Sequence, residues 1–274
     1  MGYGDDIMAS GLARGLATRG KRAAFGDRKK IIWGPWSEEI FRRNPNIARP
    51  GEEQCNDLEW IPHYKGHRMY NKLGNGHWVW DFSFKPVPGE IFFTQEELKA
   101  AERVGSNFIL IEPNVPWQKS VAVNKDWGLA NYYEVAGKLK EDFNVVQFAH
   151  GRDHMAGIRV VRTHGFRDAL AILARASLAI VPEGGLHHGA AAVGTRAVVL
   201  FGGFIPPQVT GYDTHINLTG GEPQFCGSLY RCAHCRAAMD RISVEEVYKA
   251  SIHMMSHPHS VPNDRTKSEN SYSA

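Results

Sequence analysis

The chain has 274 residues, of which 43% are hydrophobic and 22% charged, and its formal net charge is +3. This length suits one large domain or two small ones, and the composition is that of a globular protein rather than of a disordered chain. The small net charge gives no indication of a nucleic-acid partner. No leader of the secretory type opens the chain, and its longest apolar stretch, 169–181, is too short to span a bilayer, so we expect a cytoplasmic protein without a membrane span.

The first hundred residues contain only short signals of regular structure. Apolar residues at helical spacing (Met8, Leu12, Leu16) predict a helix that begins near Asp5. A short strand at 21–25 and helices at 37–43 and 95–104 are also predicted. Residues 48–95 lack periodicity but are rich in aromatic residues and histidines. They are interpreted as loops that either pack their own aromatic side chains into a small core or take part in binding.

From residue 107 onward, apolar strands alternate with helical segments. This alternation predicts an α/β fold with a parallel, doubly wound sheet, whose ligand binds at the carboxyl ends of the strands. We therefore expect a smaller domain at 1–104, a larger one at 105–259, and a flexible tail at 260–274, which has no apolar period. The strands are predicted at 108–111, 144–149, 178–181 and 197–201, and the helices at 128–139, 166–176, 187–193 and 244–255.

The turn at 183–188 follows the third of these strands and opens a helix. Its glycines, Gly184 and Gly185, let backbone amides approach a ligand closely, and the start of the helix favours a phosphate. Glu183 then suits ribose or sugar hydroxyls, and His188 suits a phosphate oxygen. The alternative is that the two glycines only make a tight strand-to-helix turn.

Three of the four cysteines, Cys226, Cys232 and Cys235, lie close together in the sequence, whereas Cys55 is remote. In a cytosolic protein such clustering indicates a metal or a local structural role before it indicates a disulfide.

The run 180–202 resembles the C-terminal motif of glycosyltransferase family 9, the ADP-heptose transferases of lipopolysaccharide assembly. That motif reads Asp-Ser/Thr-Gly, two further residues and His, followed by an alanine-rich helix, Gly-Thr-Pro and a Val-Val-Leu-Phe-Gly strand. Gly185 and His188 match it directly. Glu183 stands where the family has aspartate, Gly184 where it has a hydroxyl residue, and Arg196 where it has proline.

The resemblance implies a GT-B-like fold of two Rossmann-like domains, here with a reduced N-terminal domain. Members of the family begin with a buried strand before a Gly-Asp turn, yet only three residues precede Gly4-Asp5, so either the strand is missing or the chain starts upstream.

The resemblance also implies roles for single residues. Asp5 would be the general base that deprotonates an acceptor hydroxyl, and the alternative is that it only caps a helix. Lys125-Asp126-Trp127 is similar to a stretch whose lysine faces the donor phosphates. The resemblance thus makes Asp5 the catalytic candidate, and the donor-binding candidates are Asn114, Lys125, Glu183, Gly184, Gly185, Leu186 and His188.

Residues 226–247 resemble the family's cysteine-bearing segment, in which some members bind a metal with four cysteines. Here the fourth position is Ala238, so a metal would need His234 or another histidine to complete about four ligands. The sequence therefore indicates no required metal cofactor. Cys226, Cys232 and Cys235 are the candidates for a structural ion.

The function that the resemblance implies is transfer of a sugar, with inversion, from a nucleotide-sugar donor to an acceptor hydroxyl. An ADP-sugar is the favoured donor, and the acceptor stays open among a glycan, a protein and modified DNA. The shortened first half and the substituted motif positions motivate an alternative, a nucleotide-sugar-binding protein that has lost transfer. A sugar-nucleotide epimerase or hydrolase of the same fold is a further alternative.

Overall fold

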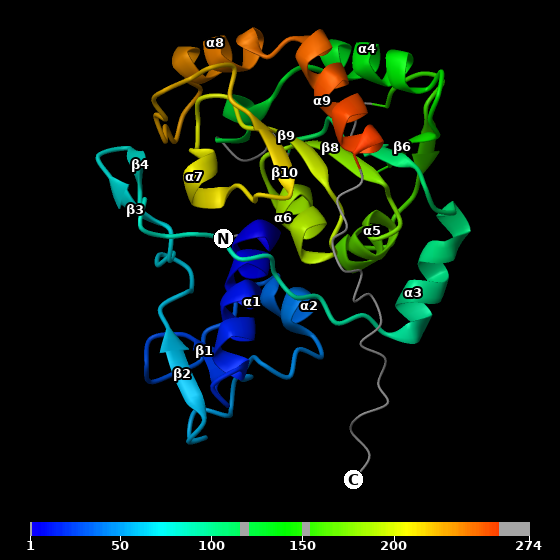
Figure 1. Ribbon diagram of the computed structural model, residues 1–274. Helices are drawn as coiled ribbons and strands as arrows, with labels where there is room; N and C mark the ends of the chain where they lie inside the picture. Colours follow the sequence, from blue (N-terminus) through cyan, green and yellow to red (C-terminus); the bar gives the residue numbers. More distant parts are fainter. Residues whose placement is uncertain (1, 116–120, 150–153, 258–274) are drawn as a thin grey trace.

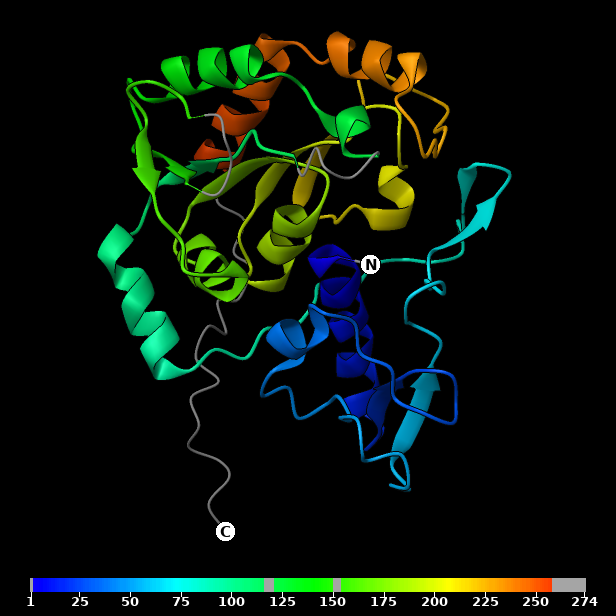
Figure 2. The same ribbon diagram turned by 180° about the vertical axis from the view of Figure 1, so that it is seen from behind.

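The computed structural model describes residues 2–115, 121–149 and 154–257, and the expected flexible tail at 260–274 lies outside them. A six-stranded sheet with helices on both faces forms the larger part of the molecule, and residues 2–93 form a smaller part beside it (Figures 1 and 2). None of the described helices is long and apolar enough to cross a membrane. The α/β architecture with a reduced first part agrees with the prediction.

The large sheet is parallel throughout, with the order β10-β9-β8-β5-β6-β7. The chain winds outward from β5 in one direction and from β8 in the other, so the winding reverses between these two neighbours. Such a switch point leaves a crevice at the carboxyl ends of the strands, where ligands bind. The predicted doubly wound sheet is therefore confirmed, with strands β5 (Ile109–Ile111), β6 (Val145–Phe148), β7 (Arg159–Val161), β8 (Leu178–Pro182), β9 (Ala197–Leu200) and β10 (His215–Leu218).

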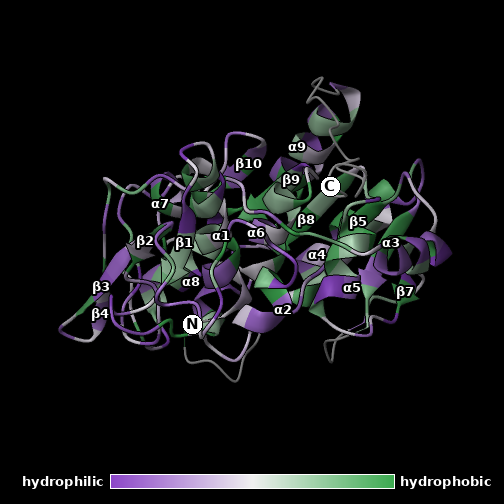
Figure 3. Ribbon diagram, turned by 90° about the horizontal axis from the view of Figure 1, so that it is seen from below, coloured by the Kyte–Doolittle hydropathy of each residue, from purple (hydrophilic) through white to green (hydrophobic). Residues whose placement is uncertain are grey.

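The central strands read as continuous apolar runs because both of their faces are covered. Leu110 and Val181 point into one core with helices α5 (Phe166–Leu173) and α6 (Gly185–Ala192). Ile109 and Ile180 point into the other, with α4 (Leu129–Leu139) and α9 (Val244–Ser256). The hydropathy colouring in Figure 3 shows the apolar strands enclosed between these helices. Each fully buried aliphatic side chain of this kind contributes about 1.5–3 kcal/mol.

Some elements of the sheet region carry no clear signal in the sequence. Strand β7 lies at the sheet edge with Arg159 and Val160 exposed, so it lacks an apolar pattern. Strand β10 is short and contains His215 and Asn217. The other elements missed by the prediction are helices α7 (Pro207–Thr210) and α8 (Ala233–Arg241) and the 3-10 turn η2 (Ala122–Lys125).

The smaller part contains more regular structure than the sequence indicates. The prediction that residues 48–95 are irregular is wrong for a parallel strand, β2, and for the hairpin β3-β4, which projects from the body of the molecule (Figure 1). Their length of four residues each explains why no period is visible. The elements here are α1 (Tyr3–Ala17), β1 (Arg22–Phe25), α2 (Ser37–Phe41), β2 (Leu58–Ile61), β3 (Asn71–Gly74) and β4 (His77–Trp80), followed by α3 (Gln95–Ala101), which packs on α5.

Helix α1 joins the smaller part to the sheet. It packs along α6, and its Ile7, Met8 and Leu16 belong to the same apolar core as the strands. On another side it is held by residues 87–89, because a Cβ on Gly11 would lie 2.4 Å from the Val87 carbonyl oxygen. The helix is therefore buried around most of its circumference, and its first turn is fixed relative to the start of α6.

Candidate functional site

A cleft of about 880 Å³ lies between the two parts, above the carboxyl ends of β5 and β8. This position is the switch point of the sheet. All eight catalytic and donor-binding candidates named from the sequence line the cleft: Asp5, Asn114, Lys125, Glu183, Gly184, Gly185, Leu186 and His188.

The β8-α6 turn forms the floor of the cleft. Gly184 precedes the helix with φ +154°, a conformation that favours glycine. Gly185 is the first residue of α6, where a Cβ would lie 3.2 Å from the Phe166 ring. The helix therefore begins immediately after the strand and presents its amino end to the cleft. That end favours a negatively charged group through its backbone amides.

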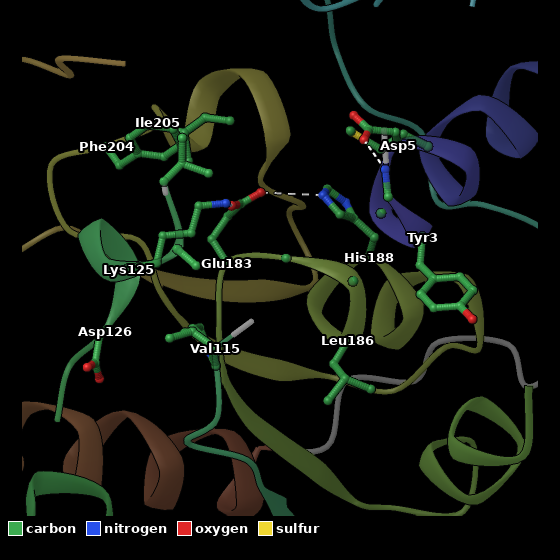
Figure 4. A pocket seen from close by; sticks show the side chains of 18 of the residues that line it. Tyr3, Asp5, Val115, Lys125, Asp126, Glu183, Leu186, His188, Phe204 and Ile205 are labelled. Atoms are coloured by element: carbon green, nitrogen blue, oxygen red, sulfur yellow. Dashed lines mark hydrogen bonds and ion pairs between the residues drawn. The ribbon is translucent and has the colours of Figure 1, made fainter. Parts of the chain in front are cut away.

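Glu183 is buried and ion-paired on two sides, as Figure 4 shows. Lys125 Nζ makes a close ion pair with Oε2, and His188 Nε2 lies 3.5 Å from Oε1. The other nitrogen of His188, Nδ1, is 2.9 Å from the hydroxyl of buried Tyr212. Burial alone would raise the pKa of Glu183, but the charge of Lys125 and the hydrogen bond from His188 outweigh it and hold the pKa at about 2. Glu183 is thus a carboxylate at neutral pH, and Lys125 is its counter-ion.

Asp5 enters the cleft from the first turn of α1. The helix begins at Tyr3 with Gly2 as its N-cap, so the alternative that Asp5 is the N-cap is wrong in detail. Its Oδ2 nevertheless accepts a 2.6 Å hydrogen bond from the Gly2 amide, which is a capping interaction. Its Oδ1 accepts a 2.7 Å hydrogen bond from Tyr70 and lies 3.0 Å from Arg68 Nε. The carboxylate therefore both caps the helix and lines the cleft.

These contacts control the ionisation of Asp5. Burial acts to raise its pKa, but the Arg68 charge, the Tyr70 hydroxyl and the Gly2 amide together lower the pKa below its ordinary value. The neighbouring Asp6 faces elsewhere: it accepts from Ser37 at 2.9 Å and contacts His63 Nε2 at 3.1 Å, all within the interior. Of the two adjacent aspartates, only Asp5 lines the cleft.

Helix α1 and helix α6 meet at His188. A Cβ on Gly4 would lie 2.6 Å from His188 Cδ2, so the glycine lets the first turn of α1 rest against the imidazole. His188 contacts Glu183, and Gly4 precedes Asp5 directly. The Gly-Asp pair therefore places the Asp5 side chain on the other side of His188 from Glu183 (Figure 4).

Sequence reasoning missed Glu112, which follows β5 and lines the cleft. Its Oε1 accepts hydrogen bonds from the Asn114 amide at 3.0 Å and from Asn114 Nδ2 at 2.6 Å. Burial raises the pKa of Glu112 to about 7, although Asn114 and the Phe148 amide act against the rise. The sequence did contain a signal for Glu112, because it follows a predicted parallel strand and ligands bind at the carboxyl ends of such strands.

Sequence reasoning also missed Arg68, Tyr70 and two tryptophans. Trp78 and Trp80 of β4 line the cleft, and the Arg68 guanidinium stacks 4.5 Å above the Trp78 ring. All of them come from the aromatic segment that was interpreted either as a small core or as a binding loop. Their position in the cleft wall favours the second interpretation. No local pattern in the sequence, however, distinguishes these four residues from the rest of the segment.

The three clustered cysteines lie together with His234. The Sγ of Cys226 lies 3.0 Å from that of Cys235 and 3.7 Å from that of Cys232. The hydrogen bond from the Cys235 thiol lowers the pKa of Cys226 below its ordinary value. With His234, the ligand atoms of the four residues all lie within 4.8 Å of one another. Three thiols and an imidazole are a donor set that suits a tetrahedral metal ion.

A second group brings ligand atoms equally close. Glu183, His187 and His188 also lie within 4.8 Å of one another, at the floor of the cleft. The Lys125 ammonium already pairs with Glu183 and opposes a metal cation there. We therefore assign this group to charge neutralisation rather than to a metal.

No protein-family model matches the chain, and no curated protein matches it in sequence. Solved structures do match in fold. A family 9 glycosyltransferase from Veillonella parvula DSM 2008 is 14% identical over 93% of this chain and 95% of its own, with a TM-score of 0.61. TibC from enterotoxigenic E. coli H10407, an iron-containing dodecameric glycosyltransferase, is 13% identical over 86% of this chain and 78% of its own, with a TM-score of 0.53.

A third structure, ADP-heptose lipopolysaccharide heptosyltransferase II of E. coli, is 16% identical with a TM-score of 0.46. The match covers 65% of this chain and 54% of that one, so this chain spans about half the length of the transferase. The match to the Veillonella protein extends over nearly the whole of both chains. In fold, the chain is therefore a GT-B-type protein similar to glycosyltransferase family 9, with a reduced N-terminal part.

Proposed function

We propose that the protein transfers a sugar from a nucleotide-sugar donor to an acceptor hydroxyl, with inversion at the anomeric carbon. One observation carries the proposal. The carboxylate of Asp5 and the charged group of Lys125, Glu183 and His188 line a single cleft from opposite sides. A base and an anion-binding surface that share one cleft are the parts that a direct displacement requires.

The donor binds on the side of the large sheet. Its diphosphate meets the amino end of α6 and the Lys125 ammonium, which stabilise negative charge on the leaving group. Glu183 and Asn114 face the ribose or sugar hydroxyls. We favour an ADP-sugar because of the motif at 180–202 and because TibC has been observed in complex with ADP-D-beta-D-heptose, in a structure that this chain matches with a TM-score of 0.56. Glu183 and Gly184 depart from that motif, so the sugar need not be a heptose.

Asp5 acts as the general base. The acceptor oxygen attacks the anomeric carbon, the bond from that carbon to the phosphate oxygen breaks, and the hydroxyl proton passes to the Asp5 carboxylate. A single displacement of this kind inverts the configuration. The Tyr70 hydroxyl and the Arg68 guanidinium orient the carboxylate and keep it ionised. Its lowered pKa means that Asp5 stays a carboxylate at every pH above the ordinary aspartate range.

The acceptor binds on the side of residues 1–104, and the donor on the side of residues 105–259. The acceptor wall contains Trp78 and Trp80, whose flat faces suit a sugar ring or an apolar side chain. A glycan and a protein are both compatible with such a wall. The proposal needs no metal in the chemical step, because Lys125 and α6 supply the positive charge.

The substitution Asp5→Asn tests the proposal. It keeps the size of the side chain and removes the base, so transfer is expected to fall by about 10²- to 10⁴-fold. Transfer is measured with a panel of ADP-, UDP- and GDP-sugars against glycan and protein acceptors. Donor binding, measured by calorimetric titration, should be unchanged in the variant, and this serves as its control for folding.

Three outcomes separate the proposal from its alternatives. Undiminished transfer by Asp5→Asn removes Asp5 from the mechanism. Tight donor binding by the wild type without any turnover supports a nucleotide-sugar-binding protein instead. Conversion of the donor in the absence of an acceptor supports an epimerase or a hydrolase.

A further inference from the structure

The four most exposed large hydrophobic side chains of the described residues gather on one protrusion. They are Tyr230, Leu73, Phe82 and Val79, which are 69%, 63%, 59% and 58% exposed, whereas the next, Tyr133 on α4, is 46% exposed. The protrusion consists of residues 71–82, which form the projecting β3-β4 hairpin and the turn after it, and of residues 228–231 (Figures 1 and 2). Hydrophobic side chains exposed singly need no explanation, but a group of them indicates an interaction surface.

Residues 228–231 belong to the protrusion because backbone hydrogen bonds attach them to the hairpin. The Trp78 amide donates to the Gly227 carbonyl at 2.8 Å, and the Leu229 amide donates to the Gly76 carbonyl at 3.3 Å. The exposed Tyr230 is therefore fixed beside the hairpin, and the two segments present one surface.

Basic side chains surround the hydrophobic ones. Lys65, Lys72, Lys85 and Arg231 are exposed, and Asp81 is the one exposed acid among residues 65–85 and 228–231. A second copy of the chain would bring the same positive charge to this surface, so electrostatic repulsion opposes self-association there. The charge instead favours an anionic partner.

A hollow beside the hairpin combines both kinds of side chain. It has a volume of about 220 Å³, and its lining includes the basic Lys65 and Arg68 together with Leu73 and Trp78. A negatively charged group attached to an apolar chain matches this combination, and a lipid with an anionic head group has that chemistry.

The exposed hydrophobic side chains point to both faces of the hairpin. In the antiparallel register Leu73 lies opposite Trp78, and Lys72 lies opposite Val79. Because neighbouring residues of a strand point to opposite faces, Leu73 and Val79 lie on opposite faces. A protein partner covers one face, and a two-stranded hairpin offers little of the roughly 1,200–2,000 Å² that a stable protein interface buries. A medium that surrounds the hairpin covers both faces.

We propose that the hairpin protrusion, residues 71–82 and 228–231, inserts into the surface of a membrane that contains anionic lipids. Its aliphatic side chains enter the boundary between head groups and acyl chains, its aromatic rings lie at the level of the head groups, and its basic side chains pair with lipid phosphates. The chain then lies on the membrane without spanning it. Trp78 and Trp80 of the same hairpin line the cleft, so the membrane lies beside that wall of the cleft.

Membrane binding is measured on the full chain by sedimentation with two kinds of vesicle. One is phosphatidylcholine alone, and the other is phosphatidylcholine with one third phosphatidylglycerol. Binding to the anionic vesicles should be tighter by about tenfold or more, and it should weaken as the salt concentration rises.

Variants of the protrusion test each contribution. Lys72→Gln should weaken binding to the anionic vesicles about fivefold, and Leu73→Asn about tenfold. Both side chains are exposed, so thermal unfolding should be unchanged in both variants. The matched controls are Lys249→Gln on α9 and Tyr133→Ser on α4, which remove an exposed lysine and an exposed aromatic residue elsewhere and should bind like the wild type.

Lipids with brominated acyl chains separate insertion from contact, because bromine quenches the fluorescence of tryptophans that lie close to it. Leu73→Trp and Val79→Trp should each gain fluorescence that the brominated vesicles quench. The fluorescence gained in Tyr133→Trp should not be quenched. Quenching at only one of positions 73 and 79 overturns the insertion of both faces.

Equal binding to the two kinds of vesicle, or binding to neither, overturns the membrane site. Binding of duplex DNA in place of vesicles, lost in Leu73→Asn, assigns the protrusion to nucleic acid instead. Self-association in sedimentation equilibrium that Leu73→Asn abolishes, again without vesicle binding, assigns it to a second copy of the chain. None of these results depends on sugar transfer.

Discussion

Two buried carboxylates line the cleft from opposite sides, and each has a cation beside it. Glu183 pairs with Lys125, and both come from segments at the carboxyl edge of one sheet. Asp5 pairs with Arg68, which comes from the segment before the β3-β4 hairpin and stacks on Trp78. The Glu183 side chain is 4% exposed and the Asp5 side chain 10%, whereas the two cations, Lys125 and Arg68, are 17% and 20% exposed. One side of the cleft is thus part of the core of the sheet, and the other depends on a peripheral hairpin.

The two sides also differ in how many groups compensate the negative charge of the carboxylate. Asp5 has the Tyr70 hydroxyl and the Gly2 amide in addition to its cation. Within the part of the chain that the structure describes, Glu183 has His188 alone besides Lys125, at the longer distance of 3.5 Å. Loss of the cation should therefore lower the free energy of unfolding more on the side of the large sheet, because a buried charge without compensation destabilises the folded state.

The largest effect is expected from removing these cations in a matched pair of variants. Lys125→Met should lower the free energy of unfolding by about 3–5 kcal/mol, because it strands the buried Glu183 carboxylate. Arg68→Met should cost about 1–2 kcal/mol, since Asp5 keeps its hydroxyl and amide donors. Urea denaturation at neutral pH measures both values.

The double variant Lys125→Met with Glu183→Gln is the control. It removes the stranded charge and should recover most of the stability while donor binding stays weak. Equal losses in the two single variants would show that the two sides of the cleft are energetically alike.

The next largest effect is expected at Glu112, whose contribution to the free energy of unfolding depends on pH. Burial raises its pKa from 4.5 to about 7, so the folded protein holds a proton that the unfolded chain has released over that range. The contribution of this group to stability is present below pH 4.5 and is lost as the pH rises through 7. Glu112→Gln, whose carbonyl still accepts from Asn114, should match the wild type near pH 4.5 and be about 3 kcal/mol more stable at pH 8.

The measurement is a series of urea midpoints for both proteins between pH 4.5 and 8. Because the comparison is between two variants at each pH, the other titrating groups cancel. A difference that does not change with pH would contradict the raised pKa of Glu112.

The smallest effects concern the contact between the two parts of the molecule. Gly4→Ala would place a Cβ 2.6 Å from His188 Cδ2, and the ring is held by Tyr212, so we expect a loss of about 1–2 kcal/mol together with weaker donor binding. Gly15→Ala lies on the same helix with nothing within 4 Å of its Cβ. It should gain about 0.5–1 kcal/mol from helix propensity.

Thermal unfolding and donor titration of the two glycine variants measure these changes. The pair separates the contact with His188 from the general effect of alanine in a helix. A gain in stability for Gly4→Ala would show that α1 does not rest against His188 as described.

Most of the large sheet and the β8-α6 turn could be predicted from local patterns in the sequence. Continuous apolar runs such as 178–181 and 197–201 separate strand from helix, and the turn residues are contiguous in the chain. Ligands bind at the carboxyl ends of parallel strands, so Glu183 could be placed in the cleft from its position alone. The resemblance to glycosyltransferase family 9 added Asp5, Asn114 and Lys125.

The side chains that complete the charged groups are brought together by the packing of distant segments. Tyr70 reaches Asp5 across 65 residues of the chain, and Arg68 reaches it through a short hairpin region without apolar periodicity. His234 joins three thiols because Gly203, on another loop, leaves space for its ring. Contacts of this kind arise from the packing of α1 on α6 and of the hairpin on residues 226–228. Local patterns in the sequence indicate the period of a helix or strand and the turns beside it. They carry no information about which side chain from a distant segment will contact that element.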